Sequence, residues 1–362
     1  MYKLKTIILS NVKCGAVAKI LNNRLAPRVD LPLATLREAL LMTPIPLHNP
    51  NFVTGTRGLI AIDKIGNRVL FLDPLTYETQ TTLDGFPTRV HELAIAPDRR
   101  TAYIPIYGDG KHGDNPHPGH LISVVDLVER RHVGDFSLSP YLAPHGLRWG
   151  PQGQLYCVCE NSAVVLELEA ATGRIKQVIN VGSDNAHRME VLPDGSKLYT
   201  ETEEDAFVAV IDLQTRQPLR PITLPCALAG IGMSPDGQTI VLVDASEPRV
   251  HVVDTATDEI THSVVLEGHS KGAQIARYSP DGAYLVVTNH DEPLATIFDR
   301  SLKHQRLLKL GKGPMDMAFH ADGKTVLIAN HDEGTINVVD LVTARVLRTF
   351  PAGEGVETLS FF

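Results

Sequence analysis

Four residues that can bind a metal ion stand at one position of a repeated segment, at a fixed distance before the turn that ends it. Three of them are His91, His145 and His187, and alignment of the last copy puts Glu357 at the same position. Neutral imidazole together with carboxylate suits Zn, Mn or Fe and leaves coordination positions open for water or substrate. The pattern predicts one divalent metal ion, of undetermined identity, bound by these four residues.

Polar residues next to the predicted ion could transfer protons during a reaction. Glu160 and Glu201 stand directly after a predicted strand in two of the histidine repeats. Tyr107 opens an expanded loop, residues 107–120, which we interpret as a substrate lid; an ordinary variable loop is the alternative. These residues are candidate acids, bases or partners of the ligands. The histidines of the loop are His112, His117 and His120.

Two further cationic residues are candidates for contact with a substrate. Arg188 lies on a predicted innermost strand, where it could bind a substrate carboxylate or pair structurally with Glu92. His269 comes just before another innermost strand, across the predicted channel from the proposed ligands. A role in the turn is the alternative for His269.

A repeat decides how these residues are positioned. Each unit begins with an apolar segment that ends in a PDG-type turn, continues with a short apolar strand and an alternating strand, and closes with a weaker fourth strand. Asp-Gly turns and period-two alternation predict four-stranded antiparallel meanders. Repeats of this kind indicate the blades of a β-propeller. The copies are residues 90–98, 144–153, 186–195, 228–237, 273–282, 314–323 and 356–362.

The two ends of the repeat region complement each other. Residues 356–362 form a first strand without its followers, whereas residues 59–86 supply three strands without a first. We therefore predict an all-β, seven-bladed propeller over 51–362, closed by pairing of the C-terminal strand with the N-terminal strands. Residues 1–50 do not fit the repeat. They are interpreted as a tail, flexible or created by a misassigned start, with Met42 as the alternative first residue.

Several segments resemble the bacterial YVTN-repeat, lactonase-like seven-bladed propellers. The resemblance is carried by SPDG turns, the second strands VVTN and LIAN, VxVxDxxT third strands and the GKGP approach to a new blade. It implies the fold but not the activity. PHGL at 144–147 is similar to repeats of streptogramin lyases, in which metal-dependent elimination uses histidines at this position. Lactonase-like propellers carry a His-Arg pair, as at 187–188, and work without a metal; the sequence departs from both patterns.

Composition narrows the partners. The net charge is −8, and no basic cluster follows residue 30, so nucleic acid is not an expected partner. No apolar run is long enough for a membrane helix. The four cysteines form neither a disulfide framework nor a CxxC pair, which favours a cytoplasmic location, although the N-terminal tail leaves organelle targeting open. The sequence does not determine the oligomeric state.

These features predict a metal-dependent lyase, isomerase or ring-opening hydrolase. The expected partner is a small oxygenated organic acid, lactone or sugar-like substrate, bound at the mouth of the central channel. A metal-free lactonase and a non-catalytic ligand- or protein-binding propeller are the alternatives. No Gly-rich nucleotide motif, HExxH or GxSxG occurs, so nicotinamide chemistry, nucleotide hydrolysis and serine-esterase chemistry lose support.

Overall fold

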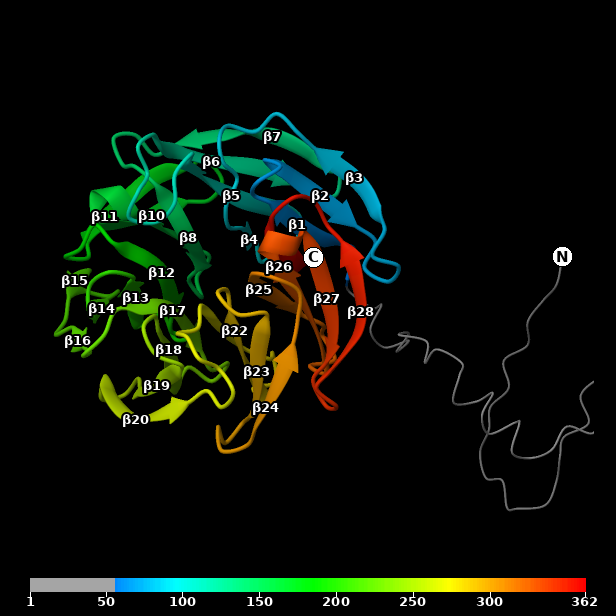
Figure 1. Cartoon of the computed structure of the whole chain (residues 1–362). Coiled ribbons are helices and arrows are strands. Elements are labelled where there is room, and N and C mark those ends of the chain that lie inside the picture. The colour runs from blue at the N-terminus through cyan, green and yellow to red at the C-terminus, as the bar shows by residue number, and fades with distance from the viewer. Residues whose placement is uncertain (1–55) are drawn as a thin grey trace, which may run out of the picture. The chain divides into compact units, whose positions relative to one another are not determined.

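The computed structural model describes residues 56–362, which form seven antiparallel sheets arranged around a common centre (Figure 1). The predicted all-β, seven-bladed propeller is confirmed. The predicted tail, residues 1–50, lies outside the described residues, as does the domain boundary at residue 51. We number the blades from the first one that the chain completes in sequence order, so that blade 7 combines both ends of the repeat region.

Within each blade, the first strand named lies nearest the centre of the ring and the last lies at its outer edge. Blade 1 contains β4 (Ala94–Ile95), β5 (Thr101–Gly108), β6 (Pro118–Asp126) and β7 (Arg131–Ser137). Blade 2 contains β8 (Pro144–Trp149), β9 (Leu155–Cys159), β10 (Val164–Glu169) and β11 (Arg174–Asn180). Blade 3 contains β12 (Ala186–Val191), β13 (Lys197–Thr202), β14 (Phe207–Asp212), β15 (Gln217–Pro218) and β16 (Ile222–Thr223). In blade 3, both β15 and β16 pair with β14.

The remaining blades follow the same order. Blade 4 contains β17 (Leu228–Met233), β18 (Thr239–Asp244), β19 (Arg249–Asp254) and β20 (Glu259–Val265). Blade 5 contains β21 (Ile275–Tyr278), β22 (Tyr284–Asn289), β23 (Leu294–Asp299) and β24 (Gln305–Lys309). Blade 6 contains β25 (Pro314–Phe319), β26 (Thr325–Asn330), β27 (Thr335–Asp340) and β28 (Arg345–Pro351). Blade 7 contains β29 (Val356–Phe361), β1 (Leu59–Asp63), β2 (Arg68–Leu72) and β3 (Thr79–Leu83). Two 3-10 turns occur, η1 (Glu160–Ser162) and η2 (His331–Glu333).

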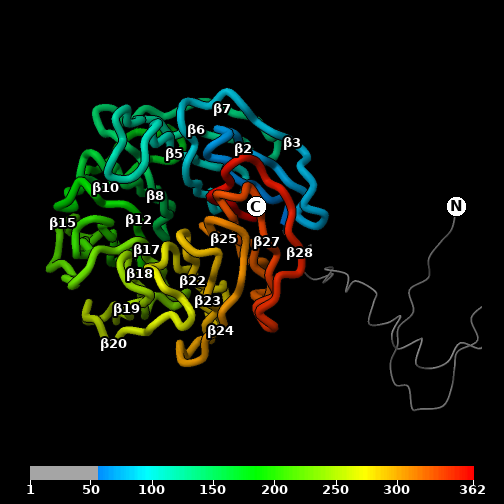
Figure 2. Tube along the Cα trace, in the orientation of Figure 1, coloured from blue at the N-terminus to red at the C-terminus, as the bar shows by residue number. Residues whose placement is uncertain are grey.

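The C-terminal strand closes the ring, as the sequence predicts. β29 pairs antiparallel with β1, and Leu59 stands opposite Phe361 at one end of the ladder. The Phe362 carbonyl accepts a hydrogen bond from the Gly58 amide at 3.1 Å. The ring of Phe362 meets Phe71 edge-on, with 5.9 Å between the centroids. Figure 2 shows the red end of the chain beside the blue strands of blade 7. This pairing covers two strand edges that would otherwise be open.

The apolar core lies between neighbouring blades. All five residues of β1 are buried, because each face of the blade packs against an adjacent blade. On one face, Ile60 and Ile62 join Ile104 and Val125 of blade 1 in a single cluster. The outermost strands cover the core on one face only, and β7 accordingly alternates between exposed and less exposed positions. Stacking between blades therefore explains why the inner strands are nearly continuous apolar runs.

Candidate metal centre

A β-bulge displaces two of the histidines, His145 and His187, from strict strand alternation. In β8, the register shifts between Pro144 and Leu147, and β12 shows the same shift between Ala186 and Met189. A bulge inserts one extra residue and redirects the side chains next to it. Alternation alone would place His145 on the core side together with Leu147. Because the bulge shifts the register at the start of the strand, His145 can face the central channel although Leu147 faces the core.

Of the three histidines of the repeat, His145 contacts both His91 and His187. The Nε2 atoms of His91 and His145 are 2.5 Å apart, and the rings of His145 and His187 have centroids 4.1 Å apart. All three side chains are almost completely buried. Burial holds the pKa of each imidazole well below its usual range, so the rings are neutral near pH 7. Neutral imidazole is the form that binds metal ions.

Each of these rings has a carboxylate oxygen near its Nδ1 atom. A carboxylate on that side fixes the orientation of a histidine and leaves Nε2 for an ion. The distances from Nδ1 of His91, His145 and His187, in that order, are 3.6 Å to Glu357, 3.4 Å to Glu92 and 3.1 Å to Glu201. The Nδ1 atoms of His91 and His145 are buried without a hydrogen bond at standard geometry. These residues therefore fit a divalent metal ion in chemical type.

Glu357 reaches the centre from the C-terminal strand of blade 7. Its Oε2 atom lies 3.6 Å from His91 Nδ1 and 3.0 Å from the Nζ atom of Lys64, which follows β1. Glu357 is therefore placed beside His91, on the ring edge that carries Nδ1. The contact with Lys64 balances the buried carboxylate, because a buried charge requires a partner.

The expanded loop of blade 1 reaches over the histidines to blade 3. Its His112 lies between Glu160, at 3.1 Å from Nδ1, and Glu203, at 3.3 Å from Nε2. Burial lowers the pKa of His112, but the hydrogen bond with Glu160 and the charge of Glu203 outweigh it, so that the pKa is raised. The loop approaches blade 3 again where Gly113, at φ +70°, lies against the Glu204 side chain.

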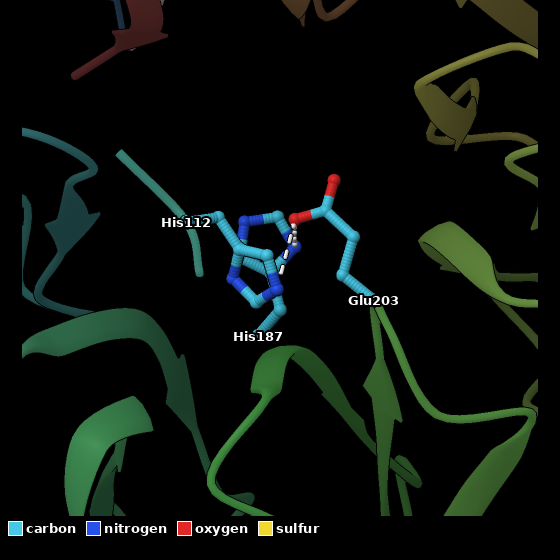
Figure 3. Close-up of side chains that lie close together, drawn as sticks. All are labelled: His112, His187 and Glu203. Atoms are coloured by element: carbon cyan, nitrogen blue, oxygen red, sulfur yellow. Dashed lines mark ion pairs between the residues drawn. The ribbon is translucent and has the colours of Figure 1, made fainter. Parts of the chain in front are cut away.

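His112 also completes a compact set of possible metal ligands, shown in Figure 3. One ligand atom each from His112, His187 and Glu203 lies within 4.8 Å of the others, and the His112 and His187 rings have centroids 4.9 Å apart. His187 therefore belongs both to the histidine array and to this second group. The loop provides an alternative position for an ion at the same centre.

Two of the predicted acid–base residues are joined directly. The Tyr107 hydroxyl donates hydrogen bonds to both carboxylate oxygens of Glu160, at 2.8 and 2.9 Å. Burial raises the pKa of Tyr107, so the phenol keeps its proton. Glu201 is fully buried, and burial raises its pKa to about 8. Tyr107, Glu160 and His112 thus form a continuous polar chain that ends beside His187.

Arg188 is committed to contacts within the protein. Its Nη1 atom donates to the carbonyl oxygen of Ala229 at 2.7 Å, and its Nε atom lies 3.4 Å from Glu92. The side chain is 3% exposed. The sequence allowed Arg188 either to bind a substrate carboxylate or to pair structurally with Glu92, and these contacts correspond to the structural pairing.

His269 lies in a different hydrogen-bond network. Its Nε2 atom is 2.8 Å from the hydroxyl of Thr296, and its Nδ1 atom is 3.2 Å from Asn289 Nδ2. Both partners belong to blade 5. The contacts of His269 thus connect strands of that blade and do not bring it to the histidine array.

Ion pairs cross the channel farther along the innermost strands. Glu190 of blade 3 contacts Arg148 of blade 2 at 3.1 Å and Arg277 of blade 5 at 3.4 Å. Arg277 also contacts Asp316 of blade 6 at 3.2 Å. Since blades 3 and 5 are not adjacent, the contact between Glu190 and Arg277 spans the central opening. Access to the histidine array is therefore expected from the face that carries the expanded loop.

Sequence reasoning did not assign several residues of this centre. Glu92 directly follows His91, yet it faces His145 of the next blade. Lys64 stands in a turn of blade 7, where no chemical motif marks it. Glu203 belongs to a run of acidic loop residues in which only Glu201 was singled out. The sequence indicated this centre through the histidines, which occupy the same position of the repeat. The repeat pattern contains no signal for contacts between side chains of different blades.

Comparison with known proteins supports the fold alone. No family model and no curated protein matches this chain. Among solved structures, a hydrazine synthase chain from Kuenenia stuttgartiensis is similar, with a TM-score of 0.63 and 18% identity over 75% of this chain and 89% of that chain. The fold thus places the protein among the seven-bladed β-propellers. Within residues 56–362, no helix is long and apolar enough to cross a membrane.

Proposed function

We propose that the protein is a metal-dependent enzyme whose divalent ion is held by His91, His145 and His187. One observation carries the proposal: three buried, neutral imidazoles lie in a row, with His145 in contact with both His91 and His187, and each has a carboxyl group near Nδ1. A propeller that only binds a partner gains nothing from this arrangement. Glu357, which its repeat position predicts to be a fourth ligand, lies on the Nδ1 side of His91 and in this proposal orients that ring.

The proposed reaction is a lyase, isomerase or ring-opening hydrolase reaction on a small oxygenated acid, lactone or sugar-like molecule. A bound ion would polarise a substrate carbonyl or carboxylate. Glu160 holds the Tyr107 hydroxyl and contacts His112, so these three side chains can hold or transfer a proton at the same centre. The ion pairs across the channel restrict the substrate to the face with the loop.

The turns and the ring closure agree with the resemblance to YVTN-repeat propellers, and this resemblance is consistent with the proposal. A cytoplasmic location also remains part of the proposal, on the grounds of cysteine usage. The metal-free lactonase stays as the rival reading, because related propellers of that kind carry a His-Arg pair at the corresponding position.

Metal analysis of the purified full chain tests the proposal. We expect about one Zn, Mn or Fe per chain at this centre, and His91→Ala and His145→Ala should each lower the occupancy while the propeller stays folded. His262→Ala, which removes an exposed histidine of β20, is the matched control. Protein that is folded but cannot be loaded at this centre would refute the proposal. Loss of metal in His112→Ala, but not in His91→Ala, would move the ion to the group formed by His112, His187 and Glu203.

A further inference from the structure

A second cluster of metal-ligand side chains lies in blade 4. Cys226 precedes β17, Asp244 ends β18 and His251 lies on β19. Asp244 and His251 are buried, and Cys226 is partly exposed. Their ligand atoms all lie within 4.8 Å of one another. We propose that these three residues bind a divalent transition-metal ion of the zinc class, at a site separate from the histidine array.

The separations between the ligand atoms match those around a tetrahedral ion. Zinc binds sulfur at about 2.3 Å and nitrogen or oxygen at about 2.0–2.2 Å, so tetrahedral ligands stand roughly 3.3–3.6 Å apart. The His251 Nε2 atom lies 3.6 Å from Cys226 Sγ and 3.5 Å from Asp244 Oδ2. Direct hydrogen bonds between nitrogen and oxygen are shorter than this second distance. The three atoms thus surround a position of suitable size for the ion.

Neighbouring groups hold two of the three ligands, His251 and Asp244, with their binding atoms facing the cluster. The hydroxyl of Ser263 lies 2.8 Å from Nδ1 of His251, which leaves Nε2 facing the cluster. The Oδ1 atom of Asp244 accepts the amide hydrogens of Ser246 and Glu247, at 2.8 and 3.0 Å, which leaves Oδ2 facing inward. Such supporting contacts fix the ring and the carboxylate of metal ligands.

Another blade carries neutral amides at the corresponding positions. In blade 6, Asn330 stands where blade 4 has Asp244, and Asn337 stands where it has His251. The Asn330 amide donates to Asn337 Oδ1 at 2.8 Å, and the Asn337 amide donates to the hydroxyl of Thr349 at 2.7 Å. A network of amides therefore suffices to join these strands. Blade 4 instead carries an acid and an imidazole at these positions, with a thiol beside them.

The surroundings allow one open coordination position. Three protein ligands leave a fourth position of a tetrahedral ion for water. The nearest cation is Arg249, whose Nε atom lies 3.9 Å from Asp244 Oδ2 and whose Nη2 atom pairs with Glu247. Because Glu247 holds this guanidinium, Asp244 keeps a carboxylate oxygen for the ion. A bound ion would tie the segment that contains Cys226 to β18 and β19.

Cobalt titration of the full chain tests this site without reference to the histidine array. A thiolate ligand gives a charge-transfer band with Co²⁺ that histidine and carboxylate ligands cannot give, so we expect one such band, lost on adding excess Zn²⁺, whether or not the histidine array also takes up cobalt. Asp244→Asn, which introduces the residue that blade 6 carries, should weaken binding at least about tenfold, as should Ser263→Ala. Cys226→Ser should abolish the band, whereas Cys14→Ser should retain it.

Two results would overturn the proposal. Folded wild-type protein without a thiolate band would show that the cluster is only hydrogen-bonded. A band that persists in folded Cys226→Ser protein would assign the thiolate to another cysteine. Far-ultraviolet circular dichroism of each variant separates loss of binding from loss of folding, and Asp244→Asn provides the decisive comparison if the Cys226 variant does not fold.

Discussion

Removal of the Phe362 side chain should weaken the closure of the ring. Phe362 is 2% exposed and packs in the cluster between blades 7 and 1, edge-on to Phe71. Truncating a buried phenylalanine to alanine costs about 3–5 kcal/mol, because the lost contacts leave a cavity. Since a protein is stable by only about 5–15 kcal/mol, Phe362→Ala should lower the denaturation midpoint strongly.

Deletion of residues 356–362 extends the same reasoning. The deletion removes Val356, Leu359 and Phe362, all at most 3% exposed, and burial of three such side chains contributes on the order of 5–9 kcal/mol. It also exposes the edge of β1 along its ladder with β29. The truncated chain should therefore lose its cooperative unfolding transition.

Chemical denaturation followed by circular dichroism provides the measurement. Leu347→Ala is the matched control, because Leu347 lies on the outermost strand of blade 6 and is 47% exposed. Its loss should change the unfolding free energy by less than about 0.5 kcal/mol. If Phe362→Ala changed stability no more than Leu347→Ala, or the truncated chain unfolded like the full chain, the argument from ring closure would be wrong.

Three other predictions concern acid stability, proton transfer and the N-terminal segment. Asp63 is fully buried; burial opposes its ionisation, but the hydrogen bonds from Arg68 and the amides of Gly355 and Glu354 prevail and lower its pKa. Its stabilising effect should be complete above the unfolded pKa, near 3.8, and should fade as pH drops through the lower folded value, so that Asp63→Asn destabilises the protein at pH 7 but progressively less below pH 3.8 in acid titrations. Once a substrate is found, Tyr107→Phe should reduce turnover by about 10²–10⁴-fold without changing metal content, and an unchanged rate would remove Tyr107 from proton transfer. A chain that begins at Met42 should keep the thermal transition and metal content of the full chain, and failure to fold would contradict the tail interpretation.

The sequence was sufficient to predict the seven blades, their strand order and the closure by residues 356–362. Short-range signals encode these features: Asp-Gly turns and period-two alternation define each meander, and a repeat without partners at both ends requires closure. The repeat also indicated that His91, His145 and His187 would gather, because equal positions in neighbouring blades face the same axis. The structure brings these three together, and their binding of an ion stays a prediction.

Tertiary structure alone decided which side chains meet across blades. Glu92 follows His91 in sequence but faces His145 of the next blade. His112 reaches Glu203 through the fold of a long loop, whose path no repeat encodes. His269 does not occupy the repeat position of the three histidines, and the structure places it beside Thr296 in blade 5. A repeating pattern fixes the register within a blade, whereas contacts between blades and loops depend on packing of the whole ring.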